Sequence, residues 1–158
     1  MNMNRNATEH KHVVLADDDR DHAFLFERIL KQVSPLHTLS VAPDGDVLLQ
    51  VLQAQPPDVL FLDLRMPSKN GIECLKEIRN TPGLSQLPIV VYSSSSKMTD
   101  IQRSYLHQAD LYMVKPFHTD HLQNALEAVL SMDLKQTTTI RNHYFINNRF
   151  VPFTATGF

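Results

Sequence analysis

The chain has 158 residues, which suits one domain with a substantial core and is too short for two full domains joined by a linker. Its formal net charge is -2, with 15 basic and 17 acidic residues interspersed, which argues against nucleic acid or an anionic membrane as a partner. The single cysteine, Cys74, excludes an internal disulfide, and the apolar runs fall far short of the roughly 20 residues of a membrane-spanning helix, so we expect a soluble, cytoplasmic protein.

Strand-like and helix-like segments alternate along the chain. Residues 1–11 are polar, lack the apolar stretch of a secretory signal, and are expected to form a short flexible lead-in. Five apolar runs of strand length follow, each succeeded by a segment whose apolar residues recur at helical spacing. The runs lie at residues 13–16, 39–41, 59–62, 89–92 and 111–114. This alternation predicts an α/β fold with helices on both faces of a parallel sheet, because parallel strands need a long return path.

The second of these runs differs from the other four. Residues 38–41 alternate polar with apolar side chains, whereas the other runs are continuously apolar, as strands buried on both faces should be. We therefore expect the second strand at an edge of the sheet. That position fits a flavodoxin-like, doubly wound, five-stranded sheet in the order 2-1-3-4-5, an order that rests on the fold type rather than on the residues alone. Helix N-caps are expected at Asp44, Asp100 and Thr119.

Polar residues gather where the predicted strands end. In an open parallel sheet, ligands bind outside the carboxyl ends of the strands, near the point where the strand order reverses. The residues that directly follow the first, third, fourth and fifth runs and carry chemistry are Asp17, Asp18, Asp19, Asp63, Ser93 and Lys115. Clustered carboxylates repel one another unless some are protonated or a cation neutralises them. An oxygen-only ligand set favours Mg²⁺ over Zn²⁺, with Mn²⁺ as an alternative, and a metal-bound carboxylate can become an aspartyl phosphate.

Four motifs in this order resemble the receiver domains of two-component response regulators. They are Val-Leu-Ala-Asp-Asp-Asp at residues 14–19, Leu-Asp-Leu-Arg-Met-Pro at 62–67 with Asn-Gly at 70–71, Val-Tyr-Ser at 91–93, and Tyr-Met-Val-Lys-Pro-Phe at 112–117. The resemblance covers residues 12–132 and is closest to single-domain receivers of the chemotaxis type. One such motif is a weak signal, but four in order, each at the end of a predicted strand, form a specific pattern.

The resemblance implies a role for each matching residue. Asp63 stands at the phospho-acceptor position, and the metal ligands are expected to be Asp17, Asp18, Asp63 and the backbone carbonyl of Arg65. Arg65 also stands at one of two positions, the other being Ser95, that vary within the family and tune how fast the phosphate is lost.

Three further positions complete the implied site. Ser93 matches the hydroxyl residue that moves towards the phosphoryl group, and Tyr112 matches an aromatic residue that changes rotamer in response. Lys115 is expected to contact the phosphoryl oxygens, and the bond from Lys115 to Pro116 to be a cis peptide, a geometry that only proline makes common.

Each of these residues also has an ordinary interpretation. Residues 17–19 alone would pass for a solvated loop that caps a helix, Asp63 for a loop aspartate and Lys115 for a surface lysine. Their convergence on one rim of the sheet favours a site instead. Tyr112 also fits a packed aromatic residue, and Cys74 a packing residue rather than a redox centre. The histidine pair at 118 and 121 lacks a third ligand and is assigned no function.

The expected function is that of a signalling phospho-acceptor, not an enzyme. A sensor histidine kinase or a phosphotransfer protein would phosphorylate Asp63, and an unidentified protein partner would read the resulting conformational change, with at most slow autodephosphorylation. Two alternatives are an aspartyl-phosphate-forming phosphatase and a receiver-like scaffold that is not phosphorylated. The phosphatase is disfavoured because its nucleophile follows the first strand, whereas Asp63 follows the third. The intact set of acidic, hydroxyl and lysine residues disfavours the scaffold.

The last part of the chain is expected to be an extension of the receiver domain, which we place at residues 12–134. Residues 135–158 carry five aromatic residues and no acidic residue, and they are too few for a DNA-binding effector domain. Apolar segments on both sides of Asn147-Asn148 predict a short hairpin. The extension is either a loosely ordered tail or an arm that packs on the receiver, pairs two copies into a homodimer, or docks a partner.

Overall fold

The computed structural model describes residues 10–154, without the side chains of residues 137–139. Five parallel strands, β1 (His12–Ala16), β2 (Thr38–Ala42), β3 (Val59–Leu62), β4 (Ile89–Ser93) and β5 (Leu111–Val114), form one sheet in the order β2-β1-β3-β4-β5. The predicted fold class, strand order and edge position of β2 are therefore confirmed. Within residues 10–154, no helix is both long and apolar enough to cross a membrane.

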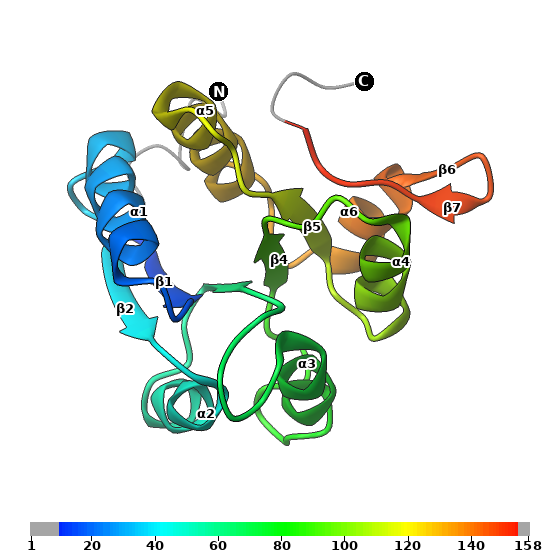
Figure 1. Cartoon of the computed structure of the whole chain (residues 1–158), viewed down its shortest axis with the longest axis horizontal. Coiled ribbons are helices and arrows are strands. Elements are labelled where there is room, and N and C mark those ends of the chain that lie inside the picture. The colour runs from blue at the N-terminus through cyan, green and yellow to red at the C-terminus, as the bar shows by residue number, and fades with distance from the viewer. Residues whose placement is uncertain (1–9, 155–158) are drawn as a thin grey trace, which may run out of the picture.

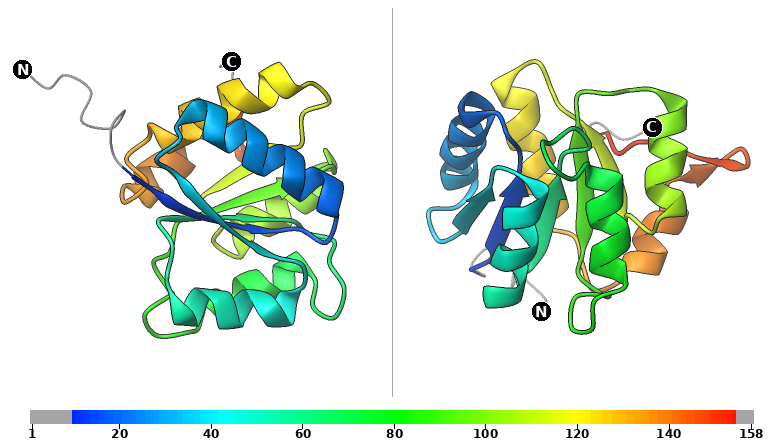
Figure 2. Two further views of the ribbon diagram at one scale, coloured as in Figure 1. Left: turned by 90° about the vertical axis from the view of Figure 1, so that its left-hand side faces the viewer. Right: turned by 60° about the horizontal axis from the view of Figure 1, so that its bottom comes forward.

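Helices cover both faces of the sheet (Figures 1 and 2). Helices α1 (Arg20–Val33) and α5 (Thr119–Leu130) pack on one face, and α2 (Gly45–Ala54), α3 (Gly71–Arg79) and α4 (Met98–Leu106) pack on the other. Alternate side chains of each strand enter two separate cores, so Val13 and Leu15 face α1 and α5 whereas Val14 faces the opposite helices. Burial on both faces explains why four of the strands are continuously apolar.

The helix starts agree only in part with the sequence. The Asp44 side chain caps α2 by accepting from the Val47 N–H, as predicted. Helix α4 instead begins at Met98, and Asp100 lies in its first turn with its carboxylate bonded to the Ser95 hydroxyl. Helix α5 begins at Thr119 itself and has His118 as its N-cap residue, so the cap predicted at Thr119 is wrong by one residue and the cap predicted at Asp100, where Lys97 is the N-cap residue, is wrong by three. A capping residue type marks the region of a helix start, but tertiary partners decide which residue takes the role.

The C-terminal extension is folded up to residue 154. The strands β6 (Phe145–Ile146) and β7 (Arg149–Phe150) form the predicted hairpin, and Asn147 and Asn148 both adopt positive φ, as a tight hairpin turn of this handedness requires. A short helix before it, α6 (Thr137–His143), was not predicted, because this segment lacks an apolar stripe. The hairpin lies beside α4, at the β5 edge of the sheet (Figure 1).

Candidate functional site

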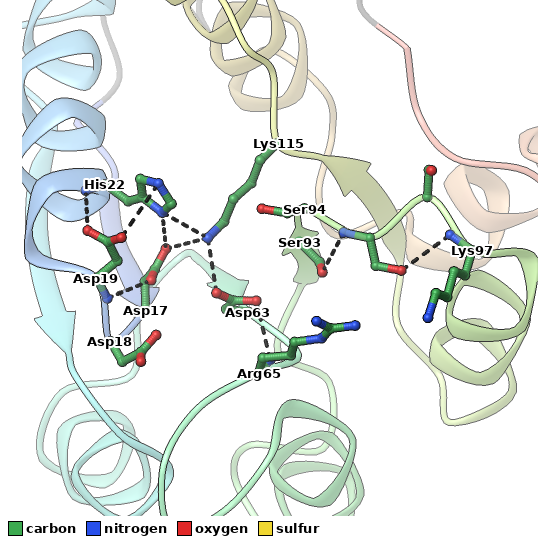
Figure 3. A pocket seen from close by; sticks show the side chains of 12 residues that line it. Asp17, Asp18, Asp19, His22, Asp63, Arg65, Ser93, Ser94, Lys97 and Lys115 are labelled. Atoms are coloured by element: carbon green, nitrogen blue, oxygen red, sulfur yellow. Dashed lines mark hydrogen bonds and ion pairs between the residues drawn. The ribbon is translucent and has the colours of Figure 1, made fainter.

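The acidic residues at the ends of β1 and β3 lie side by side because the sheet hydrogen bonding continues one residue past each strand. The Asp17 N–H donates to the Ala42 carbonyl at 3.1 Å, and the Asp63 N–H donates to the Ala16 carbonyl at 3.0 Å. Both carboxylates are buried at the carboxyl edge of the sheet, where they line one pocket together with Ser93 and Lys115 (Figure 3). The predicted convergence of strand ends on one rim is therefore a feature of the structure.

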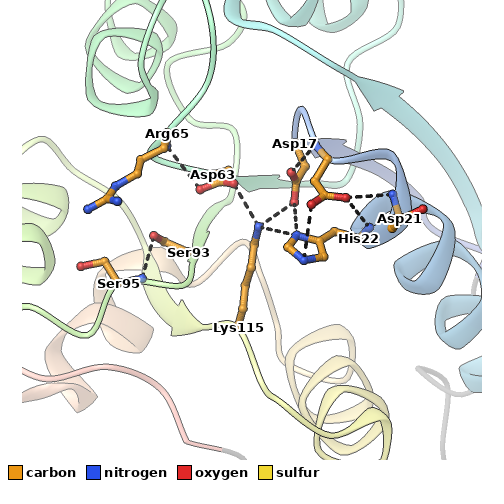
Figure 4. Close-up of polar contacts among 9 residues, drawn as sticks. Asp17, Asp21, His22, Asp63, Arg65, Ser93, Ser95 and Lys115 are labelled. Carbon is orange, nitrogen blue, oxygen red and sulfur yellow. Dashed lines mark hydrogen bonds and ion pairs between the residues drawn. The ribbon is translucent and has the colours of Figure 1, made fainter.

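Lys115 bridges the two buried carboxylates. Its Nζ lies 2.7 Å from Asp17 Oδ2 and 3.0 Å from Asp63 Oδ2 (Figure 4). The ammonium group also lies over the Tyr92 ring, 5.3 Å from its centre, in a cation–π contact. The single positive charge of Lys115 thus faces the two carboxylates of Asp17 and Asp63 in a largely desolvated pocket. The net negative charge of this group favours binding of a further cation.

Burial and the ion pairs shift the pKa values of Asp63 and Lys115 in opposite directions. Burial raises the pKa of Asp63, and the nearby Asp17 charge adds to this, while Lys115 and the Arg65 N–H oppose it without cancelling it. For Lys115, burial is the largest single effect and lowers the pKa, but the combined contacts with Asp17 and Asp63 outweigh it, so the pKa lies above its usual value. A divalent cation beside Asp63 would favour its ionised form and strengthen it as a metal ligand.

Three carboxylates are placed to hold a metal ion. Oxygen atoms of Asp17, Asp18 and Asp63 all lie within 4.8 Å of one another, the only such acidic, histidine or cysteine group among the described residues. Asp17 and Asp63 are buried, whereas Asp18 is exposed and faces the solvent side. Such a hard, oxygen-only and partly open donor set fits Mg²⁺ or Mn²⁺ and leaves positions for water and phosphoryl oxygens. The Arg65 N–H donates to Asp63 Oδ1 at 3.3 Å, which brings the Arg65 backbone next to this group.

Of the two predicted switch residues, Ser93 lies at the pocket and Tyr112 lies in the core behind it. Ser93 is buried at the end of β4, and its hydroxyl accepts from the Ser95 N–H at 3.1 Å. Tyr112 is fully buried behind the pocket, and its hydroxyl donates to the Ser95 carbonyl at 2.7 Å. Tyr112 is therefore packed in the core, as its ordinary interpretation held, and also bonded to the loop that leaves the pocket. Arg65 and Ser95 both line the pocket, Arg65 from the loop after β3 and Ser95 from the loop after β4 (Figure 4).

The predicted cis peptide is not present. No peptide bond among residues 10–154 is cis, so the bond between Lys115 and Pro116 is trans and that prediction was wrong. Even before proline the trans form is favoured by about 0.5–1 kcal/mol. Lys115 reaches both carboxylates with the bond trans, so the contacts of this site do not require the cis form.

Two titratable residues of the pocket, His22 and Lys97, were not predicted from the sequence. His22, in the first turn of α1, has its Nδ1 3.4 Å from Lys115 Nζ and 3.8 Å from Asp17 Oδ2, and its side chain is 48% exposed. Its position three residues after the helix cap Asp19 is the signal that was available, because the start of this helix lies over the strand ends. Cys74 is buried, and burial raises the pKa of its thiol to about 11, so it is a packing residue and not a nucleophile at neutral pH.

Comparisons with known proteins agree with this geometry. The family model described as "Response regulator receiver domain" matches residues 13–127. The response regulator Rcp1 of Synechocystis sp. is 29% identical over 135 residues, which cover 81% of this chain and 92% of the relative. The crystal structure of the Mn²⁺-bound form of Rcp1 has a TM-score of 0.69 at 28% identity, covering 80% of this chain and 96% of that one. That of the phosphorylated cyanobacterial phytochrome response regulator RcpA has a TM-score of 0.71 at 29% identity, covering 77% and 91%.

Proposed function

The chain belongs to the response regulator receiver domain family, and on this premise we propose that it is a phosphorylation switch whose acceptor is Asp63. The observation that carries the proposal is the position of Asp63, a buried carboxylate that lies beside two other carboxylates and forms an ion pair with the Lys115 ammonium, which also contacts Asp17. In the transfer, an Asp63 oxygen forms a bond to phosphorus while the bond from phosphorus to the donor breaks, and Lys115 neutralises charge on the phosphoryl oxygens.

Mg²⁺ is the metal we assign to this reaction, with Mn²⁺ as an alternative. Asp17, Asp18, Asp63 and the Arg65 carbonyl would hold it, and when bound it neutralises phosphoryl oxygens during transfer. The acidic group of the pocket supports this assignment, and so does the Mn²⁺-bound form of the relative Rcp1. The relative RcpA was crystallised in a phosphorylated form, which supports phosphoryl acceptance by a chain of this fold.

The response to phosphorylation would begin at Ser93. Its hydroxyl lies at the pocket, where the oxygen accepts from the Ser95 N–H and the hydroxyl proton is not used in that bond. A phosphoryl group on Asp63 would accept this proton in a charge-assisted hydrogen bond, and a rotation of Ser93 towards it would move the oxygen away from the Ser95 N–H. Because Tyr112 holds the Ser95 carbonyl, a shift of this loop is transmitted to β5. A protein partner would then read a change in the population of two conformations.

The phosphoryl donor is a sensor histidine kinase or a phosphotransfer protein, and we place the reaction in the cytoplasm. Asp63 follows β3, not the first strand, which separates this site from the phosphatase alternative considered from the sequence. Beyond slow loss of its own phosphate, the chain is not expected to turn over a substrate.

Acetyl phosphate with Mg²⁺ tests the proposal directly. Intact-mass analysis is expected to show slow addition of one phosphoryl group per chain, removed by hydroxylamine as an acyl phosphate is. Catalytic release of inorganic phosphate without a stable adduct would identify the phosphatase alternative. A chain that stays unmodified, although it binds Mn²⁺, would identify the scaffold.

Arg65 is predicted to lengthen the life of the phosphorylated state. Its exposed side chain extends from the Asp63 loop towards the β4 side of the pocket (Figure 4), where we expect it to hinder the approach of water to a phosphoryl group on Asp63. Arg65→Ala is therefore expected to speed dephosphorylation by roughly tenfold, a barrier change of about 1.4 kcal/mol. Loss of the phosphoryl mass over time measures the rate. Lys97→Ala removes another exposed cation of the pocket rim and should leave the rate near that of the unaltered chain; equal rates for both variants would refute this role of Arg65.

A further inference from the structure

The C-terminal segment of residues 144–153, which we term the arm, extends the sheet beyond β5. The Phe153 N–H donates to the Tyr112 carbonyl at 2.7 Å, and Phe153 pairs in parallel with Met113. The Phe153 side chain is buried in the core beneath α5. The arm thus occupies the outer edge of β5, where an uncovered strand would present unpaired backbone groups (Figure 1).

Tyr105 of α4 completes this edge with its hydroxyl. The oxygen accepts from the Tyr112 N–H at 2.9 Å, and the hydroxyl donates to the Val151 carbonyl at 3.3 Å. In a sheet the strand N–H would donate to the neighbouring carbonyl directly, whereas here a buried side-chain hydroxyl stands between them. Both outward backbone groups of Tyr112 are therefore satisfied by groups that either belong to the arm or contact it.

Helix α4 holds the arm by a second pair of bonds. The Gln102 side-chain amide accepts from the Phe150 N–H at 3.1 Å and donates to the Phe150 carbonyl. The Phe150 ring stacks on the Tyr105 ring, with 4.5 Å between centres and 15° between planes. Gln102 and Tyr105 are three residues apart and so lie on one face of the helix. This face of α4 binds an extended backbone through a pattern of contacts that nothing in the phosphorylation site requires.

The groups that hold the arm also contact the loop of the pocket. Tyr112, whose backbone pairs with the arm, donates its hydroxyl to the Ser95 carbonyl. Ser95 bonds through its hydroxyl to Asp100 in the first turn of α4, shortly before Gln102. The Ser95 N–H donates to the Ser93 hydroxyl at the pocket. One contiguous set of contacts therefore joins the pocket to the arm through β5 and through α4.

We propose that the arm is an internal ligand of the β5 edge and α4, docked in the unphosphorylated chain and released when Asp63 is phosphorylated. The inference rests on the proposed function, because the trigger is a rotation of Ser93 that lets its hydroxyl donate to the phosphoryl group and takes its oxygen away from the Ser95 N–H. Loss of that bond frees the loop, the start of α4 shifts, and the bonds of Gln102 and Tyr105 to the arm lose their alignment. Release uncovers an unpaired strand edge, the kind of surface that an extended segment of a protein partner can join.

Because coupling between two sites is reciprocal, the proposal makes two linked predictions for the full chain. Beryllofluoride with Mg²⁺, which mimics the phosphoryl group, is expected to speed hydrogen exchange of the Phe150 and Phe153 amides about fivefold or more. Weakening the arm contacts by Gln102→Ala, or by Tyr105→Phe, which keeps the ring, is expected to tighten beryllofluoride binding by a similar factor. The ¹⁹F resonance of the adduct measures binding.

Gln123→Ala serves as the matched control, since Gln123 lies in α5 and its amide contacts only Glu127, at 3.5 Å, among the hydrogen bonds of the described residues. It should bind beryllofluoride like the unaltered chain. The proposal would be overturned if the beryllofluoride adduct formed without faster hydrogen exchange of the arm amides, or if the Gln102 and Tyr105 variants bound beryllofluoride no more tightly than this control. Either result would leave the proposed phosphorylation of Asp63 unaffected. An adduct that slows exchange would overturn the proposal as well. If no adduct forms in any chain, the proposed function fails and this inference fails with it.

Discussion

Asp63→Asn is expected to abolish phosphorylation of the chain by acetyl phosphate and Mg²⁺. The asparagine amide has nearly the same shape as the carboxylate but cannot act as the nucleophile or carry the charge that attracts a metal ion. Because burial and Asp17 raise the pKa of Asp63, its ionised form opposes folding, and removing that charge should not unfold the metal-free chain. Intact mass after incubation measures the result, and a thermal melt confirms that the variant is folded.

Asp120→Asn is the matched control for this experiment. Asp120 is an exposed aspartate in the first turn of α5, outside the pocket, and its variant should be phosphorylated at the rate of the unaltered chain. If Asp63→Asn still gained one phosphoryl group, the acceptor would have to be another pocket residue such as Asp17 or Asp18, and the assignment of Asp63 would be wrong.

Lys115→Met is expected to have the largest effect on stability. The Lys115, Asp17 and Asp63 side chains are almost fully buried, with exposed fractions of 9%, 0% and 10%. Removing one partner of a buried ion pair leaves uncompensated charge and costs about 3–5 kcal/mol. We therefore expect the free energy of unfolding in urea, without added metal, to fall by about 3 kcal/mol near neutral pH.

The loss should depend on pH and on metal in a defined sense. The pKa of Asp63 is already raised, so the stability associated with its protonated form is present at low pH and lost as the pH rises through the folded-state pKa. Without Lys115 that pKa rises further, so the deficit should be large at about pH 7.5 and should shrink as the pH falls and the Asp63 carboxyl becomes protonated in the folded chain. Millimolar Mg²⁺ should restore part of the stability by supplying the missing positive charge.

Lys97→Met provides the comparison, since Lys97 is an exposed lysine that lines the same pocket and forms no ion pair with the described residues. Its variant should unfold like the unaltered chain at both pH values. A Lys115→Met deficit that did not change with pH or with Mg²⁺ would mean that Lys115 contributes mainly through packing of its aliphatic stem, and the electrostatic account of the pocket would be wrong.

The parts of the molecule that the sequence predicted correctly share a local cause. Continuous apolar runs mark strands buried on both faces, and the alternating pattern of residues 38–41 marks the edge strand β2. The sequence also predicted the main residues of the pocket, because each lies at the end of a strand and all carboxyl ends of a parallel sheet meet at one edge. These residues are Asp17, Asp63, Ser93 and Lys115. The hairpin was found from the turn preference of Asn147-Asn148.

The features that the sequence missed depend on partners far away in the chain. His22 enters the pocket because α1 starts over the strand ends, and Asp100 does not cap α4 because the Ser95 hydroxyl engages its carboxylate. The cis peptide was expected from resemblance alone, whereas the trans bond also lets Lys115 reach both carboxylates.

By itself, then, the sequence determined the fold class, the strand order implied by that fold, and the set of polar residues at the rim, because periodicity and position relative to a strand are local properties. Only the tertiary structure decided that the aromatic extension packs on the receiver. The Tyr105 hydroxyl lies between Tyr112 and Val151, and Gln102 binds the Phe150 backbone. The bonds from Tyr105 and Gln102 to the extension join residues 46 and 48 positions apart in sequence. They can form only because α4 and β5 pack together and bring these partners within bonding distance.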